Sequence, residues 1–176
     1  IKFTGVNPEK ITVTLESADE LPKGNEPVDE LIGKKFIMYI GRPTPHKNLR
    51  RLIDAFALLQ KKYPDLTLAL AGKKDSNYAR HEAYVNEHGI KNVVFTGFIS
   101  DEQLRWMYEN TAVYCFPSLS EGFGLPGLEA MLHGAPVASS TATCLPETHG
   151  DAAHYFDPFS VEDIAKSIDD ILSDDK

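Results

Sequence analysis

The sequence is short of cysteine, of long apolar runs and of net positive charge, and each shortage argues against a class of protein. Two cysteines in 176 residues are too few for a disulfide framework, so we expect reduced thiols and a cytoplasmic protein. No stretch approaches the roughly 18 consecutive apolar residues that cross a bilayer, and no basic-then-apolar start resembles a signal peptide. The formal net charge of −8 argues against nucleic acid as a partner.

What is present is the composition of a soluble globular domain. Apolar residues make up 42% of the chain and charged residues 25%, close to the averages for such domains. The length suits one domain with a substantial core, and Cys115, inside an apolar run, is expected in that core. The sequence begins at Ile1 without a methionine, so we expect a piece of a longer protein.

Short apolar runs alternate with amphipathic stretches from residue 36 onward. The expected strands are continuously apolar, as buried parallel strands are: Phe36–Ile40, Leu66–Ala71, Val93–Thr96, Ala112–Phe116, Pro136–Ser139 and Ala153–Phe156. The expected helices lie between and after them: Leu49–Lys62, Tyr78–His88, Glu102–Glu109, Pro126–His133 and Val161–Leu172, with a short turn near Pro146. This alternation predicts an α/β fold, a Rossmann-like doubly wound parallel sheet with helices on both faces.

The ends of these elements carry their own signals. Asn48, Asp101 and Ser160 are the expected N-caps of three helices. Residues 1–34 hold one strand candidate, Ile11–Leu15, followed by an acidic, proline-containing stretch without helical periodicity. We therefore predict an entry segment at 1–34, an interdomain linker, and a ligand-binding domain at 35–176.

Ligands of an open parallel sheet bind beyond the carboxyl ends of its strands, so the loops that follow strands are the places to search. Gly41, Gly72 and Gly97 each come directly after an expected strand, where a missing side chain lets a ligand approach the backbone. The loop after the first strand, GRPTPHKN, also brings two cations, Arg42 and Lys47. We expect both cations at the mouth of the same cleft as Glu121 and Glu129.

The stretch EGFGLPGLEA places a glycine-rich turn between a strand and a helix. The free N–H groups of Gly124 and Leu125, at the positive end of the helix that begins near Pro126, predict an anion site. Glu129, one turn inside the helix, would reach a hydroxylated group beside the anion, and Glu121 would contact the group on its far side. A phosphate with hydroxyl-bearing groups on both sides describes a sugar nucleotide, whose charge Arg42 and Lys47 would balance.

Rival motifs are weaker. Gly122, Gly124 and Gly127 match the dinucleotide fingerprint G-x-G-x-x-G. An NAD-dependent oxidoreductase nevertheless fits less well, because the match follows the fourth strand, Pro126 interrupts it, and no acid ends the next strand. His46 lies between the two loop cations and is interpreted as a surface histidine. We expect no metal, since the other histidines lack ligand spacing, and the sequence contains neither a P-loop nor a nucleophile elbow.

Five segments together carry a family resemblance: GRPTPHKNLRRLIDAFALL, LALAG, VVFTGFISDEQL, FPSLSEGFGLPGLEAMLHGAPVASS and LPETHGDAAHYFDP. They resemble the C-terminal, donor-binding domain of family 4 glycosyltransferases (glycosyl transferases group 1), which have the two-domain GT-B fold. The likeness runs from Val6 to Leu172. Glu121 and Glu129 match the family's E-x7-E pattern, and GVNPEKITV resembles its interdomain linker.

The resemblance implies a role for each motif. It makes Glu121, Arg42 and Lys47 catalytic, with Glu121 at the transferred sugar and the cations on the diphosphate, while Glu129 binds the ribose. The donor-binding residues that it implies are Gly41, Arg42, Lys47, Gly72, Phe98, Ile99, Glu121, Gly122, Phe123, Gly124, Leu125 and Glu129. Among them, residues 98 and 99 flank the base.

The implied activity is a retaining, metal-independent transfer of a hexose, mannose or glucose, from a UDP- or GDP-sugar. The acceptor, a glycan or lipid-linked saccharide, would bind through an N-terminal domain absent from this chain, so the isolated chain would be inactive. We expect a cytoplasmic protein, with peripheral association at the inner face of the membrane as an option for the whole protein. A non-catalytic nucleotide-sugar-binding module and a sugar-nucleotide epimerase stay open as alternatives.

Overall fold

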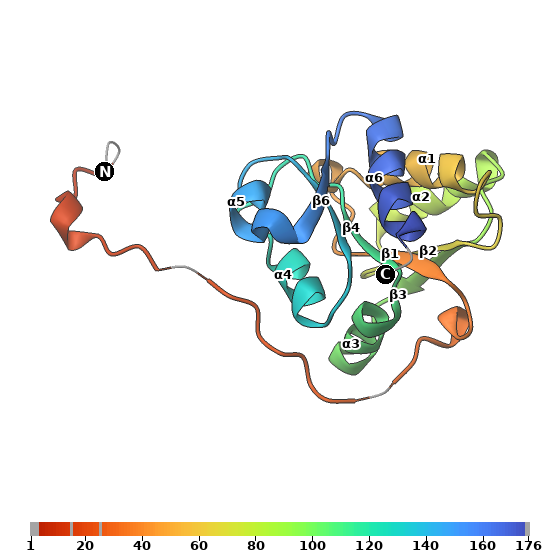
Figure 1. The fold of residues 1–176 in the computed structure, drawn as a ribbon, viewed down its shortest axis with the longest axis horizontal. Coiled ribbons are helices and arrows are strands. Elements are labelled where there is room, and N and C mark those ends of the chain that lie inside the picture. Colours follow the sequence, from red (N-terminus) through yellow and green to blue (C-terminus); the bar gives the residue numbers. More distant parts are fainter. Residues whose placement is uncertain (1–3, 15, 25, 175–176) are drawn as a thin grey trace.

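The computed structural model describes residues 4–14, 16–24 and 26–174, and its centre is a six-stranded parallel sheet between helices (Figure 1). The strands are β1 (Phe36–Ile40), β2 (Thr67–Ala71), β3 (Val93–Gly97), β4 (Val113–Phe116), β5 (Val137–Ser140) and β6 (Ala153–Phe156). They lie in the order β3-β2-β1-β4-β5-β6, and all neighbours are parallel. The predicted doubly wound sheet is confirmed, and its strand order reverses between β1 and β4, where ligands of such sheets bind.

In the part of the chain that the structure describes, six α-helices cover the two faces of the sheet: α1 (Leu49–Leu59), α2 (Ser76–Glu87), α3 (Asp101–Asn110), α4 (Leu125–Leu132), α5 (Leu145–His149) and α6 (Val161–Ser173). Apolar residues of α1, α2 and α6 form one core cluster, and those of α3, α4 and the start of α5 form the other. Cys115 is fully buried in the first cluster, as predicted. Each face therefore gains its stability from amphipathic helices that bury their apolar sides.

Helix starts follow local capping chemistry, and two expected caps need correction. Ser100, and not Asp101, caps α3, because Ser100 and Gln103 form a reciprocal capping box. Asn48 does precede α1, but it lies in the left-handed region and its side chain does not cap the helix. Ser160 caps α6 as predicted, since its hydroxyl accepts a hydrogen bond from the N–H of Asp163.

Element boundaries differ from the predictions by a few residues. The helix predicted from Tyr78 begins two residues earlier, because Asp75 accepts hydrogen bonds from two N–H groups of its first turn. The helix expected to start near Pro126 starts at Leu125, which makes Pro126 its second residue. The turn predicted near Pro146 is the short helix α5. Gly97 is the last residue of β3 and does not follow it.

The segment before β1 has neither a strand nor an α-helix among residues 4–14, 16–24 and 26–34, and its first part extends away from the sheet (Figure 1). The predicted strand Ile11–Leu15 is therefore wrong for residues 11–14, while Leu15 lies outside the described residues. Its apolar side chains have no core to enter, since Ile11 is 45% exposed and Val13 is 82% exposed. The alternation of apolar residues with threonine resembled a strand, but no sheet edge lies beside it.

The later part of this segment is attached to the domain. The N–H of Leu21 donates to His133 Nε2 (3.3 Å), and Arg105 Nη1 donates to the Leu21 carbonyl (2.8 Å). Val28 and Leu31 are buried against the face that α3 and α4 cover. The entry segment thus reaches β1 along the same face of the sheet as α4.

Candidate functional site

The loops that follow β1 and β4 meet at the switch point of the sheet. The N–H of Leu119 donates to the carbonyl of His46 (2.7 Å). The side-chain amide of Asn48, which is 5% exposed, donates to the carbonyls of Pro117 (2.9 Å) and Pro158 (2.8 Å). This explains why Asn48 does not cap α1, because its amide donors hold two other loops and its Oδ1 accepts a hydrogen bond from Arg51 Nη1.

The centre of the site is an ion pair between these two loops. Lys47 Nζ lies 2.6 Å from Glu121 Oε1, and the two side chains are only 21% and 12% exposed. The hydroxyl of Thr143, in the loop after β5, accepts a hydrogen bond from the N–H of Glu121 (3.1 Å) and donates one to the carbonyl of Glu121 (3.2 Å). The ion pair is therefore held by three strand-end loops, and it is better shielded from solvent than ordinary surface pairs.

The second acid of the pattern, Glu129, points toward the same region. The hydroxyl of the buried Tyr108 donates to Glu129 Oε2 (3.4 Å). Burial raises the pKa of Tyr114 well above its usual value, and the charges of Tyr108, Tyr39, Glu121 and Glu129 raise it further. Both carboxylates thus act on the same buried phenol of β4, Glu121 from the loop after that strand and Glu129 from α4.

Three buried hydroxyl groups lack hydrogen-bond partners within the described residues: those of Tyr39, Tyr114 and Ser118. Each of these residues is fully buried, and they stand on β1, on β4 and two residues after β4. Burial also raises the pKa of Tyr39, with smaller contributions from Tyr78 and Glu121. Tyr39 packs in the core cluster with α1, α2 and α6, and Tyr114 packs in the cluster with α3 and α4, so the two phenols lie on opposite faces of the sheet. Buried hydroxyls without a partner are costly.

The helix that carries Glu129 starts at an unusual turn. Gly124, the N-cap of α4, has φ 105°, which favours glycine. A Cβ there would lie 2.6 Å from Leu145 Cδ2, and a Cβ at Gly127 would collide with the ring of His149. His149 also contacts the carbonyl of Gly124 through Nε2 (3.3 Å) and Ser139 Oγ through Nδ1 (3.2 Å). Two of the three motif glycines therefore make room for α5.

The N–H groups of Gly124 and Leu125 form no hydrogen bond to another backbone group within the described residues. They lie at the positive end of an eight-residue helix, the arrangement that proteins use to bind phosphate. Gly122, earlier in the turn, is exposed and has open space around it. The start of α4 can thus accept an anion.

The structure does not bring Arg42 to the Lys47–Glu121 pair. Its side chain is 78% exposed, and its Nε lies 3.6 Å from Asp75 Oδ2 in the loop after β2. The N–H of Tyr78 is the main group that lowers the pKa of Asp75, and Arg42 contributes to the same shift. Arg42 therefore stands at the edge of the site, where only a change of rotamer would direct it inward.

The glycines after β1 and β2 accommodate protein neighbours. A Cβ at Gly41 would lie 2.7 Å from the Tyr39 hydroxyl, and a Cβ at Gly72 would lie 2.7 Å from the Tyr78 hydroxyl and collide with the Gly41 carbonyl. The Tyr78 hydroxyl donates to the carbonyls of Ala71 (2.7 Å) and Gly41 (3.0 Å). Close packing of β1 against β2 explains both glycines without a ligand.

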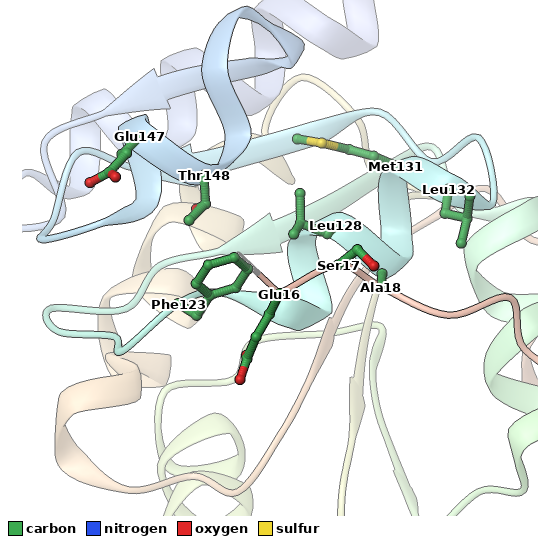
Figure 2. Close-up of a pocket in the computed structure, with 9 residues that line it drawn as sticks. All are labelled: Glu16, Ser17, Ala18, Phe123, Leu128, Met131, Leu132, Glu147 and Thr148. Carbon is green, nitrogen blue, oxygen red and sulfur yellow. The ribbon is translucent and has the colours of Figure 1, made fainter. Parts of the chain in front are cut away.

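The remaining predicted residues line two separate cavities. Phe98, 85% exposed, and the half-buried Ile99 line one of about 290 Å³ together with residues 26–30 of the entry segment. Phe123 lines an apolar groove of about 580 Å³ beside α4 (Figure 2), where its ring lies between Glu16 and the end of α5. Phe123 thus faces the entry segment.

The described residues contain no group of three or more histidine, cysteine or acidic side chains placed to hold a metal ion. Nor does any helix among them combine the length and apolar character that crossing a membrane requires.

Comparison with known proteins assigns the family. The family described as "Glycosyl transferases group 1" matches residues 24–176. The chain belongs to this family. O-antigen chain mannosyltransferase B of Escherichia coli is 36% identical over 152 residues, which are 83% of this chain and 39% of that protein. This chain therefore spans about two fifths of the length of this curated relative.

Two solved structures of glycosyltransferases resemble this chain and place it within the GT-B architecture. The C-terminal domain of LpcC, a glycosyl transferase group 1 family protein from Francisella tularensis, superposes with a TM-score of 0.71 at 30% identity, over 83% of this chain and 80% of that chain. HepE of Anabaena, solved in complex with UDP-glucose, superposes with a TM-score of 0.71 at 25% identity, over 82% of this chain and 40% of that chain. The fold is the Rossmann-like C-terminal half of a GT-B glycosyltransferase.

Sequence reasoning missed the residues that support this site. Tyr108 and His149 hold Glu129 and the turn before α4, yet both resemble ordinary core residues in the sequence. Tyr39 and Tyr114 stand within buried strands, which was the one available signal, because a phenol in an all-apolar strand needs a hydrogen-bond partner.

Proposed function

We propose that this chain is the donor-binding part of a retaining glycosyltransferase that takes a hexose from a nucleotide-diphosphate sugar. The observation that carries the proposal is the shielded Lys47–Glu121 pair at the switch point, beside the start of α4. Two similar proteins support it: one is named as a mannosyltransferase, and the other was solved with UDP-glucose. We propose mannose or glucose as the sugar for this reason.

In this proposal, the diphosphate accepts hydrogen bonds from the N–H groups of Gly124 and Leu125 and from Lys47. Glu129 accepts hydrogen bonds from the ribose hydroxyls, and Glu121 faces the hexose. When the bond between the anomeric carbon and the diphosphate breaks, Lys47 and the helix dipole stabilise the departing charge. The carboxylate of Glu121 stabilises the positive charge that develops on the sugar. These groups supply the charge that the proposal needs without a metal.

The remaining predicted donor contacts have defined places in the proposal. Phe98 and Ile99 flank the base in their cavity, which lies beyond the end of β3. Arg42 leaves Asp75 to join the diphosphate when the donor binds. The acceptor, a glycan or a lipid-linked saccharide, binds to a part of the whole protein outside this chain. The chain alone therefore binds the donor without transferring the sugar.

The other function classes lack a supporting observation. A dinucleotide enzyme would need an acid at the end of β5 to bind a ribose, and β5 ends in Ser139 and Ser140. Two glycines of the literal fingerprint, Gly124 and Gly127, are explained by packing against α5. No feature of the site favours an epimerase or a purely non-catalytic module over a transferase.

Calorimetry tests the proposal directly. The chain is titrated with UDP, GDP and NAD⁺ in the presence of a chelator. We expect one of the two nucleoside diphosphates to bind at a single site and NAD⁺ not to bind. A folded sample that binds neither diphosphate, or that binds one only after metal is added, would refute the proposed site.

A further inference from the structure

A charged cavity lies on the face of the sheet opposite α4. It encloses about 320 Å³ between the loop after β1 and the first halves of α1 and α2. Three of the five arginines of the chain line it, Arg50, Arg51 and Arg80, together with His81. The described residues that line this cavity, hereafter the arginine cavity, include no carboxylate, although the chain as a whole has a net charge of −8.

The two arginines of α1 are held in place by their neighbours. Arg51 Nη1 donates to Asn48 Oδ1 (2.9 Å), and Asn48 is itself buried and fixed by its amide. Arg50 Nε lies 3.3 Å from Asp54 Oδ2, and its guanidinium covers the ring of Tyr84. Both guanidinium groups are therefore ordered before any ligand arrives, and each keeps N–H donors that these contacts do not use.

The α2 side of the arginine cavity adds one free charge and one neutral donor. Arg80 is exposed and forms no ion pair or side-chain hydrogen bond with the part of the chain that the structure describes. Burial lowers the pKa of His81, and the charge of Arg50 lowers it further, which favours the neutral imidazole. Of the three arginines, only Arg50 has a carboxylate partner among residues 4–14, 16–24 and 26–174.

We propose that the arginine cavity binds the phosphate group of a small anionic ligand, at a site separate from the proposed donor site. Guanidinium groups match the oxygens of phosphate in geometry and charge, which is why arginine is over-represented in phosphate sites. The volume of the cavity is at the lower end for small-molecule sites, so it suits a phosphomonoester better than a dinucleotide. The phosphate comes either from a soluble phosphomonoester or from a lipid headgroup.

Four variants separate this site from the donor site. Arg80→Gln and Arg51→Gln remove charge from the arginine cavity, Lys61→Gln removes the same charge at the opposite end of α1, and Lys47→Met alters the proposed donor site. Inorganic phosphate is titrated into each protein by calorimetry. We expect Arg80→Gln and Arg51→Gln to weaken phosphate binding at least tenfold, because charge-assisted hydrogen bonds are lost. Lys61→Gln should leave it unchanged, and Arg80→Gln should leave nucleoside diphosphate binding unchanged.

Two further arms identify the source of the phosphate. Glycerol 3-phosphate is titrated as a soluble phosphomonoester, and sedimentation is measured with phosphatidic acid vesicles against phosphatidylcholine vesicles. Tenfold loss with Arg80→Gln in either arm supports the proposal and assigns the source. The proposal is overturned if no phosphate compound binds, if Arg80→Gln and Arg51→Gln bind like the wild type, or if only Lys47→Met abolishes binding. The last result would place the phosphate at the donor site.

Discussion

Replacing the two members of the central ion pair should change nucleotide affinity in opposite directions. In the proposed site, Lys47 donates to the diphosphate, and a charge-assisted contact contributes about 1.5–3 kcal/mol. Since about 1.4 kcal/mol is a factor of ten, Lys47→Met should weaken binding of the nucleoside diphosphate roughly ten- to a hundredfold. Glu121→Gln removes a negative charge next to the diphosphate and releases Lys47 from its 2.6 Å contact. It should tighten binding of the same nucleotide severalfold.

Stability should respond differently from affinity. Exposed ion pairs contribute roughly 0–1 kcal/mol, whereas removing one partner of a buried pair costs about 3–5 kcal/mol. With side chains 21% and 12% exposed, the Lys47–Glu121 pair lies between these limits. We expect each single variant to lose about 2 kcal/mol of unfolding free energy, and the double variant to lose less than the sum.

The assays are calorimetry with the nucleoside diphosphate that binds and urea unfolding. Both are applied to the wild type, Lys47→Met, Glu121→Gln and the double variant. Lys61→Met is the matched control, since it removes an exposed lysine that follows α1, and it should change neither quantity. The reasoning is refuted if both single variants lower stability while nucleotide affinity stays within twofold of the wild type. The pair would then be a structural contact only.

Three further predictions concern the residues that support the site. Tyr108→Phe removes the hydroxyl that donates to Glu129 (3.4 Å) and should weaken UDP or GDP binding about three- to tenfold, as measured by calorimetry. If Glu129 holds the ribose, the affinity of the 2′-deoxy nucleotide should differ less between this variant and the wild type. An equal loss of affinity for both nucleotides would contradict this. Gly127→Ala should lower the free energy of unfolding by about 1–3 kcal/mol, because its Cβ would meet the buried His149 ring; a urea midpoint equal to that of the wild type would show that α5 adjusts. Burial lowers the pKa of His149, so the unfolded chain takes up this proton more readily. Stability should therefore be full above the ordinary histidine pKa of about 6.5 and fall as the pH drops through the lowered one, and urea unfolding between pH 7.5 and 5 should give a smaller decline in His149→Gln.

The fold could be predicted because buried parallel strands are continuous apolar runs. Segments such as Phe36–Ile40 and Val113–Phe116 have no other plausible place than the interior of a sheet. The same reasoning failed at residues 11–14, where a short apolar alternation has no neighbouring strand. The pattern of apolar residues indicates which side chains a segment can bury, whereas strand pairing depends on a neighbouring strand.

The candidate site could be predicted in part, through residues that stand at strand ends. Lys47 and Glu121 were expected in one cleft, and the structure places them in contact. The partner of Arg42 could not be predicted, because Asp75 follows a different strand and becomes a neighbour only in the sheet. Gly72 was assigned to a ligand, but the Gly41 carbonyl and the Tyr78 side chain fill the space beside it. Neither residue is adjacent to Gly72 in the sequence. Contacts of this kind depend on three-dimensional packing.

The most direct test of the account is a crystal structure of this chain with the nucleoside diphosphate that binds in calorimetry. The account predicts the terminal phosphate between Lys47 Nζ and the N–H groups of Gly124 and Leu125, with the ribose hydroxyls at Glu129. A terminal phosphate in the arginine cavity, or on any surface away from the start of α4, would contradict it.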